Sequence, residues 1–546
     1  MCTTVPTVAW AENPRSEIRD PKEIRSPKSE WPGTKYRSGV APSQRVAERV
    51  SVLGFRISFG LREFGFRIFA SLFLGASLFV LPGAEAANVQ TLFTYPSSVT
   101  QQAGNWISLK AELNYNNNLS NAPIAVVMHG YSASSDIASI RANAQRLRDA
   151  GFFAISVTMR GREGSQGVRD SGGVEIYDIY DAVEAVKVSY APFVNPTNVH
   201  ITGYSGGGGN AMSALTKFPD YFCLGSGFFG MSDYGLDLVN GWYNNGANYG
   251  GLRTPQLDAD IGNPNTGGPL VLDRYRARAS NLASKNNPYS EIHLFVNWDE
   301  PICPAVNSIS YWSNAVAAQS FPGEFTNITL HLGTNGVYHD FNTNGLNEPT
   351  ELQYWVHGNS AASQQASAEA WYLTRLKNGL IPLPKLNASD ELYVAGWVKT
   401  RPFELWLGDG QNAAGTLNYA LSPVKKQFSL GLLSSVKTVT GKLTVDTSDM
   451  SGLLVTVRTN GVLAHTFTGG GVYSYRALGD GQTITLSAPP RLSVARDGAG
   501  LILAWPIGTL LEAETLDGPW ATNAIAVPPY SVTPTNFQRF FRVQVN

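Results

Sequence analysis

Six short apolar runs, separated by segments of helical periodicity, limit the fold of this chain more than any other feature. The runs occupy residues 123–130, 152–161, 198–205, 223–230, 291–300 and 327–333. Nearly continuous apolar runs of this length are typical of strands buried on both faces of a parallel sheet. Apolar residues recur at helical spacing over 137–147 and 176–186, and with period two over 107–115. The pattern predicts the α/β class, with helices on both faces of a mainly parallel sheet and one antiparallel strand ahead of it.

The composition is that of a globular protein with several domains. The chain has 546 residues, of which 43% are hydrophobic and 15% charged, and its formal net charge is -1. This balance gives no sign of a nucleic-acid partner. The sequence shows no common metal-binding motif, no carboxylate cluster and no glycine-rich phosphate loop. We therefore predict no cofactor and no metal.

An apolar run at 68–81 predicts a signal peptide at the end of a long N-terminal extension, 1–86. The run has the length of a signal-peptide core, and Ala84-Glu85-Ala86 forms an A-x-A cleavage site after it. It is too short to span a bilayer comfortably. We expect cleavage near Ala86/Ala87, a secreted, periplasmic or cell-surface protein, and no stable membrane span. The 67 residues ahead of the run leave two alternatives, a translation start further in or an uncleaved anchor with a disordered tail.

A serine flanked by glycines follows the third apolar run. Residues 203–207 read Gly-Tyr-Ser-Gly-Gly, the pattern G-x-S-x-G, between a predicted strand and the helical segment NAMSALTKF. Strand, sharp turn, serine and helix make up the nucleophile elbow, in which small residues two positions either side of the serine let strand and helix approach each other. The helix N-terminus adds positive potential where an oxyanion forms. The pattern predicts Ser205 as a nucleophile, and the alternative is a glycine-rich turn with an incidental serine.

Candidates for the acid and the base follow Ser205 in the order acid, then histidine, that this elbow requires. Asp299 ends the fifth apolar run, and His339 follows the sixth after a turn-rich segment. At the carboxyl edge of the sheet, His339 could take the serine proton while Asp299 holds the other ring nitrogen. His357 is the one serious competitor, and its Tyr-Trp-Val context favours a structural role. Glu300 is set aside because adjacent residues of a strand point to opposite faces.

The first apolar run ends in His129-Gly130-Tyr131, which completes the predicted site. The backbone N–H groups of Tyr131 and of Gly206, directly after the nucleophile, are predicted to form the oxyanion hole. The alternative interpretation is a plain turn at the end of a strand.

The segment 231–290 predicts a lid or substrate-binding insertion. It is 60 residues long, well beyond the usual strand-to-helix connection, and is rich in asparagine, glycine and aromatic residues. Long loops over an active site commonly form lids or binding surfaces. The candidate substrate-binding residues are Tyr204, Tyr234, Trp242 and Tyr243. The alternative is that these rings pack the insertion together.

Two of the three cysteines lie in the predicted hydrolytic region. Cys223 begins one predicted strand, and Cys303 lies past the far end of the next. A strand length of roughly 20 Å separates the two ends, which is beyond bridging distance. We expect two free, buried thiols.

Between about 88 and 380 the sequence resembles an α/β-hydrolase, and it is most similar to the catalytic domain of the prolyl oligopeptidase family and related esterases. The likeness lies in MRGREGSQG (159–167), DSGGVEIYDIYDAVEAV (170–186), the elbow, YRARAS (275–280), NWDEPICP (297–304) and YHDF (338–341). The resemblance implies Ser205 as nucleophile, Asp299 as acid and His339 as base, with Tyr131 and Gly206 as oxyanion donors. A tyrosine of the family donates through its hydroxyl, so the resemblance leaves open whether Tyr131 acts by side chain or by backbone.

Two departures from the family leave the substrate open. Its peptidases carry a large β-propeller ahead of the hydrolase domain, and the short segment between the expected cleavage site and the sheet cannot hold one. The acid loop also has NWDE where a glycine often precedes the aspartate. We predict a secreted, prolyl-oligopeptidase-like serine hydrolase that cleaves peptide or ester bonds through an acyl-enzyme. The alternatives are a carboxylesterase on carbohydrate or acyl esters, and an inactive binding or adhesion protein on a hydrolase scaffold.

Helical patterning stops after the predicted hydrolase domain, 87–380. Residues 381–389 predict a linker, 390–488 a β-sandwich, and 489–546 a small β module with a hairpin around Asp497-Gly498. The module resembles those at the C-termini of secreted bacterial enzymes, which implies attachment, with a cell surface or a glycan as partner, beside the peptide or ester substrate. Four tryptophans are either core or a carbohydrate-binding face, and they are Trp397, Trp406, Trp505 and Trp520.

Overall fold

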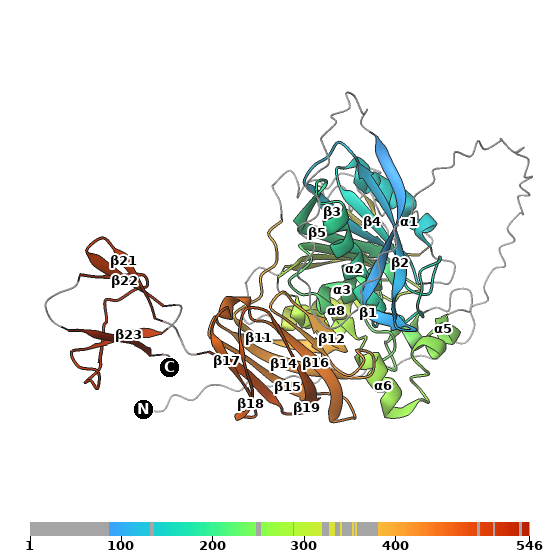
Figure 1. The fold of residues 1–546 in the computed structure, drawn as a ribbon. Coiled ribbons are helices and arrows are strands. Elements are labelled where there is room, and N and C mark those ends of the chain that lie inside the picture. The colour runs from blue at the N-terminus through green and yellow to red at the C-terminus, as the bar shows by residue number, and fades with distance from the viewer. Residues whose placement is uncertain are drawn as a thin grey trace, which may run out of the picture. The chain divides into compact units, whose positions relative to one another are not determined.

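An eight-stranded sheet dominates the first part of the protein (Figure 1). The computed structural model describes residues 87–131, 136–246, 253–287, 289–318, 327–333, 339–340, 352–353, 355–357, 381–488, 492–505, 508–533 and 538–544. The sheet contains β1 (Asn88–Gln102), β2 (Asn105–Asn116), β3 (Ala122–Met128), β4 (Phe153–Thr158), β5 (Val194–Tyr204), β6 (Leu224–Phe228), β7 (Glu291–Asn297) and β8 (Ile328–Gly333). The predicted signal peptide and the rest of residues 1–86 lie outside the described residues.

The strand order is β1-β2-β4-β3-β5-β6-β7-β8, with β1 and β2 antiparallel and the other strands parallel to one another. The six apolar runs are β3 to β8, and the period-two segment is β2, so the predicted α/β class with a mainly parallel sheet is confirmed. Strand β1, the long edge strand that pairs with β2, was not predicted. Because β3, β5, β6, β7 and β8 are parallel, their carboxyl ends meet at one edge of the sheet, where loops carry functional residues.

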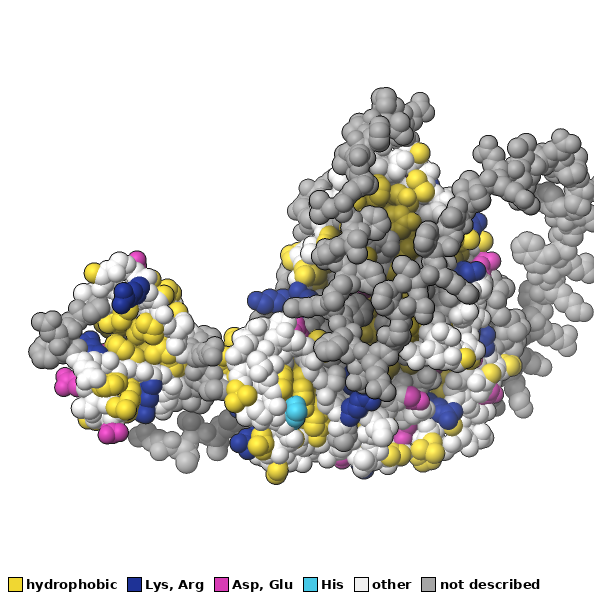
Figure 2. All heavy atoms as spheres, viewed as in Figure 1, with side chains coloured by type: hydrophobic (Ala, Val, Ile, Leu, Met, Phe, Trp, Pro, Cys, Tyr) yellow, Lys and Arg dark blue, Asp and Glu magenta, His cyan; other side chains and the backbone are white. Residues whose placement is uncertain are grey.

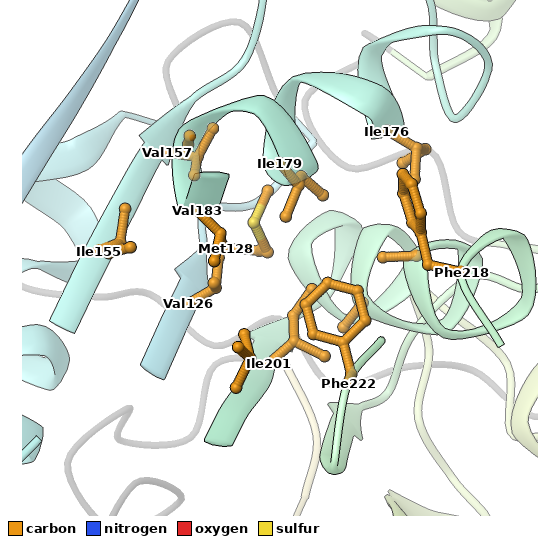
Figure 3. Packing of buried hydrophobic residues seen from close by; sticks show 14 of the residues in the cluster. Val126, Met128, Ile155, Val157, Ile176, Ile179, Val183, Ile201, Phe218 and Phe222 are labelled. Atoms are coloured by element: carbon orange, nitrogen blue, oxygen red, sulfur yellow. The ribbon is translucent and has the colours of Figure 1, made fainter. Parts of the chain in front are cut away.

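Helices cover both faces of the sheet, and the alternation of side chains along the strands decides which helix packs where. The helices are α1 (Ile137–Asp149), α2 (Glu175–Ser189), α3 (Gly206–Lys217) and α8 (Val306–Ala317). Val126 and Met128 of β3 pack in the cluster that holds α2, α3 and α8, whereas Ala125 and Val127 pack with α1. Figure 3 shows the first cluster, in which Val126 and Met128 lie beside the apolar side chains of α2. Each fully buried Val, Leu or Ile contributes about 1.5–3 kcal/mol, so the two clusters fix both the sheet and its helices.

The predicted insertion, 231–290, is built of short helices. They are α4 (Trp242–Asn245), α5 (Arg253–Asp260), α6 (Gly268–Arg276), α7 (Ser280–Ala283) and the 3-10 turn η2 (Ser284–Asn286). Further along the chain, the two-residue strands β9 (His339–Asp340) and β10 (Leu352–Gln353) pair with each other, with His339 opposite Gln353.

Two antiparallel sheets follow the α/β region, and together they form a β-sandwich. One contains β11 (Ser389–Ala395), β14 (Ala414–Leu421), β15 (Lys425–Leu432), β17 (Leu454–Thr459), β18 (Val462–Thr468) and β20 (Thr483–Ser487). The other contains β12 (Trp397–Lys399), β13 (Phe403–Trp406), β16 (Thr438–Asp446) and β19 (Val472–Gly479), and the 3-10 turn η3 spans Ser448–Met450. Residues of both sheets fill one shared apolar core, so the two sheets stabilise each other.

This β-sandwich packs directly against the α/β region. Trp397 is fully buried and belongs to the core that contains α2 and α3, with Trp406 packed against it. Asn286 and Tyr393 exchange two hydrogen bonds, from Asn286 Nδ2 to the Tyr393 carbonyl at 2.7 Å and from the Tyr393 N–H to Asn286 Oδ1 at 2.7 Å. Trp397 is therefore core.

The C-terminal residues form two small three-stranded sheets. They contain β21 (Ser493–Asp497), β22 (Gly500–Ala504), β23 (Thr509–Ala513), β24 (Ala521–Thr522), β25 (Tyr530–Val532) and β26 (Phe540–Gln544). The predicted hairpin around Asp497-Gly498 is confirmed by the pairing of β21 with β22. Trp505 is buried in the core of this module, and Figure 2 shows further hydrophobic side chains at its surface. No helix in the described part of the chain is long and apolar enough to cross a membrane.

Candidate active site

Ser205 lies between β5 and α3 in a strained backbone conformation. Its φ is 55° and its ψ -121°, in the left-handed range that side chains other than glycine rarely adopt. Its N–H donates to the carbonyl of Phe228, at the end of β6, at 3.0 Å. A strained serine on a sharp strand-to-helix turn is the geometry of the nucleophile elbow, and it presents the side chain at the carboxyl edge of the sheet.

The glycines around Ser205 are required by the close approach of three backbone segments. A Cβ at Gly203 would lie 2.3 Å from the carbonyl oxygen of Gly207, and a Cβ at Gly207 would lie 2.2 Å from that of Met128. Further along α3, a Cβ at Gly208 would lie 2.8 Å from the carbonyl oxygen of Phe228. The glycine run therefore lets the start of α3 pack directly on the ends of β3 and β6.

The two predicted oxyanion donors lie side by side. A Cβ at Gly206 would lie 2.2 Å from the backbone nitrogen of Tyr131, so the main chains of these residues are in direct contact. Gly206 is the first residue of α3, where N–H groups have no partner inside the helix. In the described part of the chain, neither N–H has a backbone hydrogen-bond acceptor. Both are thus available to an external oxyanion.

The Tyr131 side chain points into the protein. Its hydroxyl hydrogen-bonds to the hydroxyl of Ser171, and its ring packs edge-on against Trp242 at a centroid distance of 5.0 Å. Burial raises the pKa of the Tyr131 hydroxyl, so it stays protonated. Arg162 Nη1 donates to the Tyr131 carbonyl at 2.9 Å. With side chain and carbonyl both engaged by the protein, the backbone N–H is the group left for a substrate, which favours the backbone over the hydroxyl as donor.

His129 holds the oxyanion loop to the neighbouring strand. Its Nδ1 donates to the carbonyl of Gly130 at 2.8 Å, and its Nε2 accepts from the N–H of Met159, just past β4, at 3.4 Å. Burial and the nearby Arg162 lower the pKa of His129 to about 4, so the ring is neutral at pH 7. A neutral ring with both nitrogens engaged is structural, so His129 is not available as a catalytic base.

The acid loop follows β7, and it contains Asp299 and Glu300. Asp299 is half-buried, whereas Glu300 is buried and accepts four hydrogen bonds. Oε1 of Glu300 accepts from the N–H groups of Ile302 at 2.7 Å and Cys303 at 2.9 Å and from His357 Nδ1 at 2.6 Å, and Oε2 accepts from the His357 N–H at 2.6 Å. The carboxylate of Glu300 thus fixes its own loop and attaches the segment of His357 to it.

The described contacts bring His357 to the acid loop, while the side chain of His339 lies outside the described residues. The His357 ring packs on the ring of Phe229, just past β6, at a centroid distance of 4.6 Å. An acid bonded to Nδ1 of a histidine is half of a catalytic triad, and Glu300 and His357 have that arrangement. The pairing of Asp299 with His339 stays a prediction. No hydrogen bond in the described part of the chain joins Ser205 to a histidine.

The aromatic residues of the insertion form a core of their own. Tyr234, Trp242 and Tyr243 are buried, and they pack in one cluster with Tyr131 and Cys303. The hydroxyl of Tyr243 donates to Asp258 at 2.7 Å and the indole N–H of Trp242 to the carbonyl of Ile302 at 2.8 Å. Tyr204 is half-buried and stacks on Phe228 at 4.7 Å. These contacts favour packing for the three insertion residues, and their role in substrate binding stays a prediction, as does that of Tyr204.

Cys223 and Cys303 are buried, and neither forms a disulfide in the described part of the chain, as the sequence predicts. Among the described residues, no group of three or more His, Cys, Asp or Glu side chains is placed to hold a metal ion.

The strand order, the elbow and a family match all indicate an α/β-hydrolase fold. Residues 138–253, which include α1, α2, Ser205 and α3, match the prolyl oligopeptidase family. The sheet order and the serine turn are those of the α/β-hydrolase fold. The family match supports a serine hydrolase of the peptidase type, and no curated protein matches the sequence.

Solved structures similar to this hydrolase include larger peptidases. The acylaminoacyl peptidase of Pyrococcus horikoshii is 15% identical with a TM-score of 0.38, and the match covers 55% of this chain and 43% of that one. A puromycin hydrolase is 15% identical with a TM-score of 0.40, covering 55% and 41%, and oligopeptidase B of Leishmania major is 14% identical with a TM-score of 0.37, covering 53% and 37%. This chain therefore matches less than half the length of each.

Proposed function

We propose that this protein is a serine hydrolase that cleaves peptide or ester bonds through an acyl-enzyme formed on Ser205. The observation that supports it most is the strained serine at the start of α3, next to the paired N–H groups of Tyr131 and Gly206. Ser205 Oγ attacks the carbonyl carbon as a histidine takes the hydroxyl proton, and the two N–H groups stabilise the oxyanion. The intermediate expels the amine or alcohol, which receives that proton, and water then releases the acid from the enzyme.

Two acid–base pairs can serve this reaction. Asp299 and His339 are the pair that the sequence and its family resemblance favour. Glu300 and His357 are the pair that the described contacts favour, because a carboxylate bonded to Nδ1 orients a histidine to act through its other nitrogen. Single alanine variants of the two histidines decide between the pairs.

A peptidase is the first candidate activity and a carboxylesterase on carbohydrate or acyl esters is the second. The match to the prolyl oligopeptidase family supports the first. The second uses the same nucleophile and oxyanion hole, since amide and ester hydrolysis share the acyl-enzyme route. A binding protein on an inactive scaffold is the candidate from another class.

A fluorophosphonate probe tests this proposal on the purified full-length protein. We expect one probe per chain by intact mass, with no labelling of Ser205→Ala. The variant that lacks the true base should lose kcat on p-nitrophenyl esters by about 10³-fold or more, as triad removals do, while the other histidine variant keeps most activity. The ratio of ester to peptidyl-anilide turnover then separates esterase from peptidase. A folded protein that neither reacts with the probe nor turns over any substrate is a binding protein, and the proposal fails.

A further inference from the structure

The hydroxyl of Tyr131 is the first member of a buried polar chain that leads away from the oxyanion hole. It contacts the hydroxyl of Ser171, which also hydrogen-bonds to Oδ2 of Asp260. A serine has one hydroxyl hydrogen, and the carboxylate can only accept, so Ser171 donates to Asp260 and accepts from Tyr131. The Tyr131 hydroxyl therefore donates its only hydrogen to Ser171. The carboxylate of Asp260, which can only accept, fixes the donor-to-acceptor direction of both hydrogen bonds.

Asp260 is held firmly at the last position of α5. Arg169 binds it with two parallel hydrogen bonds, Nε to Oδ2 at 2.8 Å and Nη2 to Oδ1 at 3.0 Å. The side chain of Asp260 is 7% exposed and that of Arg169 25%, so it is the carboxylate of the pair that is shielded from solvent. Two-pronged, charge-assisted pairing of this kind fixes orientation as well as distance. Ser171 and Asp260 are 89 residues apart in the chain, so the link is entirely tertiary.

Helix α6 supports the end of α5, and the β-sandwich supports α6. Arg274 Nη1 donates to the carbonyl of Ile261 at 3.1 Å, and the Tyr275 hydroxyl donates to that of Gly262 at 2.9 Å. The buried Asp273 of α6 accepts from the N–H of Ser435 at 2.8 Å. A continuous series of contacts therefore links the β-sandwich to α6, α6 to the end of α5, and α5 to Tyr131 through Ser171.

We infer that Asp260 is a positioning residue, which sets the backbone of Tyr131 through Ser171 and so places one oxyanion donor. This inference rests on the proposed function. Oxyanion donors act only when they are held within about 0.5 Å of the productive geometry. The side chain of Tyr131 is held by Ser171 and its carbonyl by Arg162, and these contacts help to set the position of its N–H. The insertion then has a part in catalysis that needs no contact with substrate.

A double-mutant cycle on the full-length protein tests the inference, with Asp260→Ala, Tyr131→Phe and the variant that carries both. Each single variant should lose kcat on a p-nitrophenyl ester by about 10- to 100-fold with KM within about threefold, because a misplaced donor weakens the transition state more than the ground state. The double variant should match the lower single variant within about threefold, since both changes break one chain. Asp497→Ala is the control, because Asp497 is an exposed aspartate of the C-terminal module and lies outside the insertion and the contacts that link Tyr131 to Asp260, and it should keep wild-type kcat.

The rate of fluorophosphonate labelling of Ser205 is the second readout, and it should fall in parallel with kcat because the phosphonyl oxygen uses the same hole. Multiplicative losses in the double variant, or unchanged kcat in Asp260→Ala, would overturn the inference while leaving the proposed function intact. If Asp260→Ala does not fold, Ser171→Ala breaks the chain at its middle and enters the same cycle. A wild-type protein without labelling or turnover defeats the proposed function instead.

Discussion

Replacing Gly206 by alanine should disable the oxyanion hole while leaving the protein folded. The added Cβ would lie 2.2 Å from the Tyr131 nitrogen and 2.4 Å from the Tyr131 Cβ. Non-bonded heavy atoms approach to about 3.5 Å, so the two backbones must separate by more than about 1 Å. Neither neighbour is a flexible side-chain end. The strain has to be relieved by moving the oxyanion loop away from α3.

The size of the effect follows from that displacement. A misplacement of about 1 Å costs on the order of 10²-fold in rate, and losing one oxyanion donor costs about 2.7–4 kcal/mol. We therefore expect kcat of Gly206→Ala to fall by about 100-fold or more with KM nearly unchanged. Overpacking of this kind costs about 1–3 kcal/mol of stability, which lowers Tm without unfolding the protein at 25 °C.

Steady-state kinetics on a p-nitrophenyl ester, with circular dichroism to confirm folding, measures this prediction. Gly471→Ala is the control, because a Cβ there meets no atom within 4 Å, and it should behave as wild type. A folded Gly206→Ala variant that keeps kcat within about threefold of wild type would refute the argument. The N–H of Tyr131 would then not be the donor, or the hole would lie elsewhere.

Three further predictions concern pH, stability and processing. Burial raises the pKa of Asp181 to about 7, above its unfolded value, so the folded state favours the protonated acid. The free energy of unfolding should therefore fall as pH rises from about 4 to 7. Asp181→Asn, which cannot ionise, should raise Tm more at pH 8 than at pH 5. Arg278→Ala removes the buried partner of Asp170 and should cost about 3–5 kcal/mol of unfolding free energy in urea titrations, whereas Lys285→Ala, at the exposed pair with Glu391, should cost under about 1 kcal/mol. N-terminal sequencing of exported protein should give a chain that begins near Ala87, and a retained 1–86 segment would contradict cleavage.

The sequence predicts the sheet and the elbow because both depend on local patterns. The apolar runs that became β3 to β7 are largely buried on both faces, which makes them continuous and easy to find. The run that became β8 is apolar enough to be found although β8 lies at the sheet edge and is only partly buried. Ser205 is equally visible, because glycines must flank it where α3 meets the strands. Strand β1 lacks such a signal, since it lies at the sheet edge with one exposed face and alternates weakly.

Residues that act through tertiary contacts could not be predicted. Arg162, Ser171 and Asp260 carry no motif of their own, and the contact from Ser171 to Asp260 joins residues 89 positions apart in the chain. Glu300 was set aside by the rule that neighbours on a strand point to opposite faces. That rule does not apply here, because β7 ends at Asn297 and Glu300 lies in the turn that follows.

The contacts of the β-sandwich change how the region after the hydrolase is understood. The short helices of the insertion share one small aromatic core, and ordering each residue costs about 1–2 kcal/mol of backbone entropy. Contacts with the β-sandwich offset part of this entropy cost, because the β-sandwich binds Asp273 and Asn286 at the C-terminal end of the insertion. Since α6 in turn holds the end of α5, which carries Asp260, removing the β-sandwich should loosen the oxyanion loop as well as the interface. The β-sandwich is then a structural part of the active site rather than a separate attachment module.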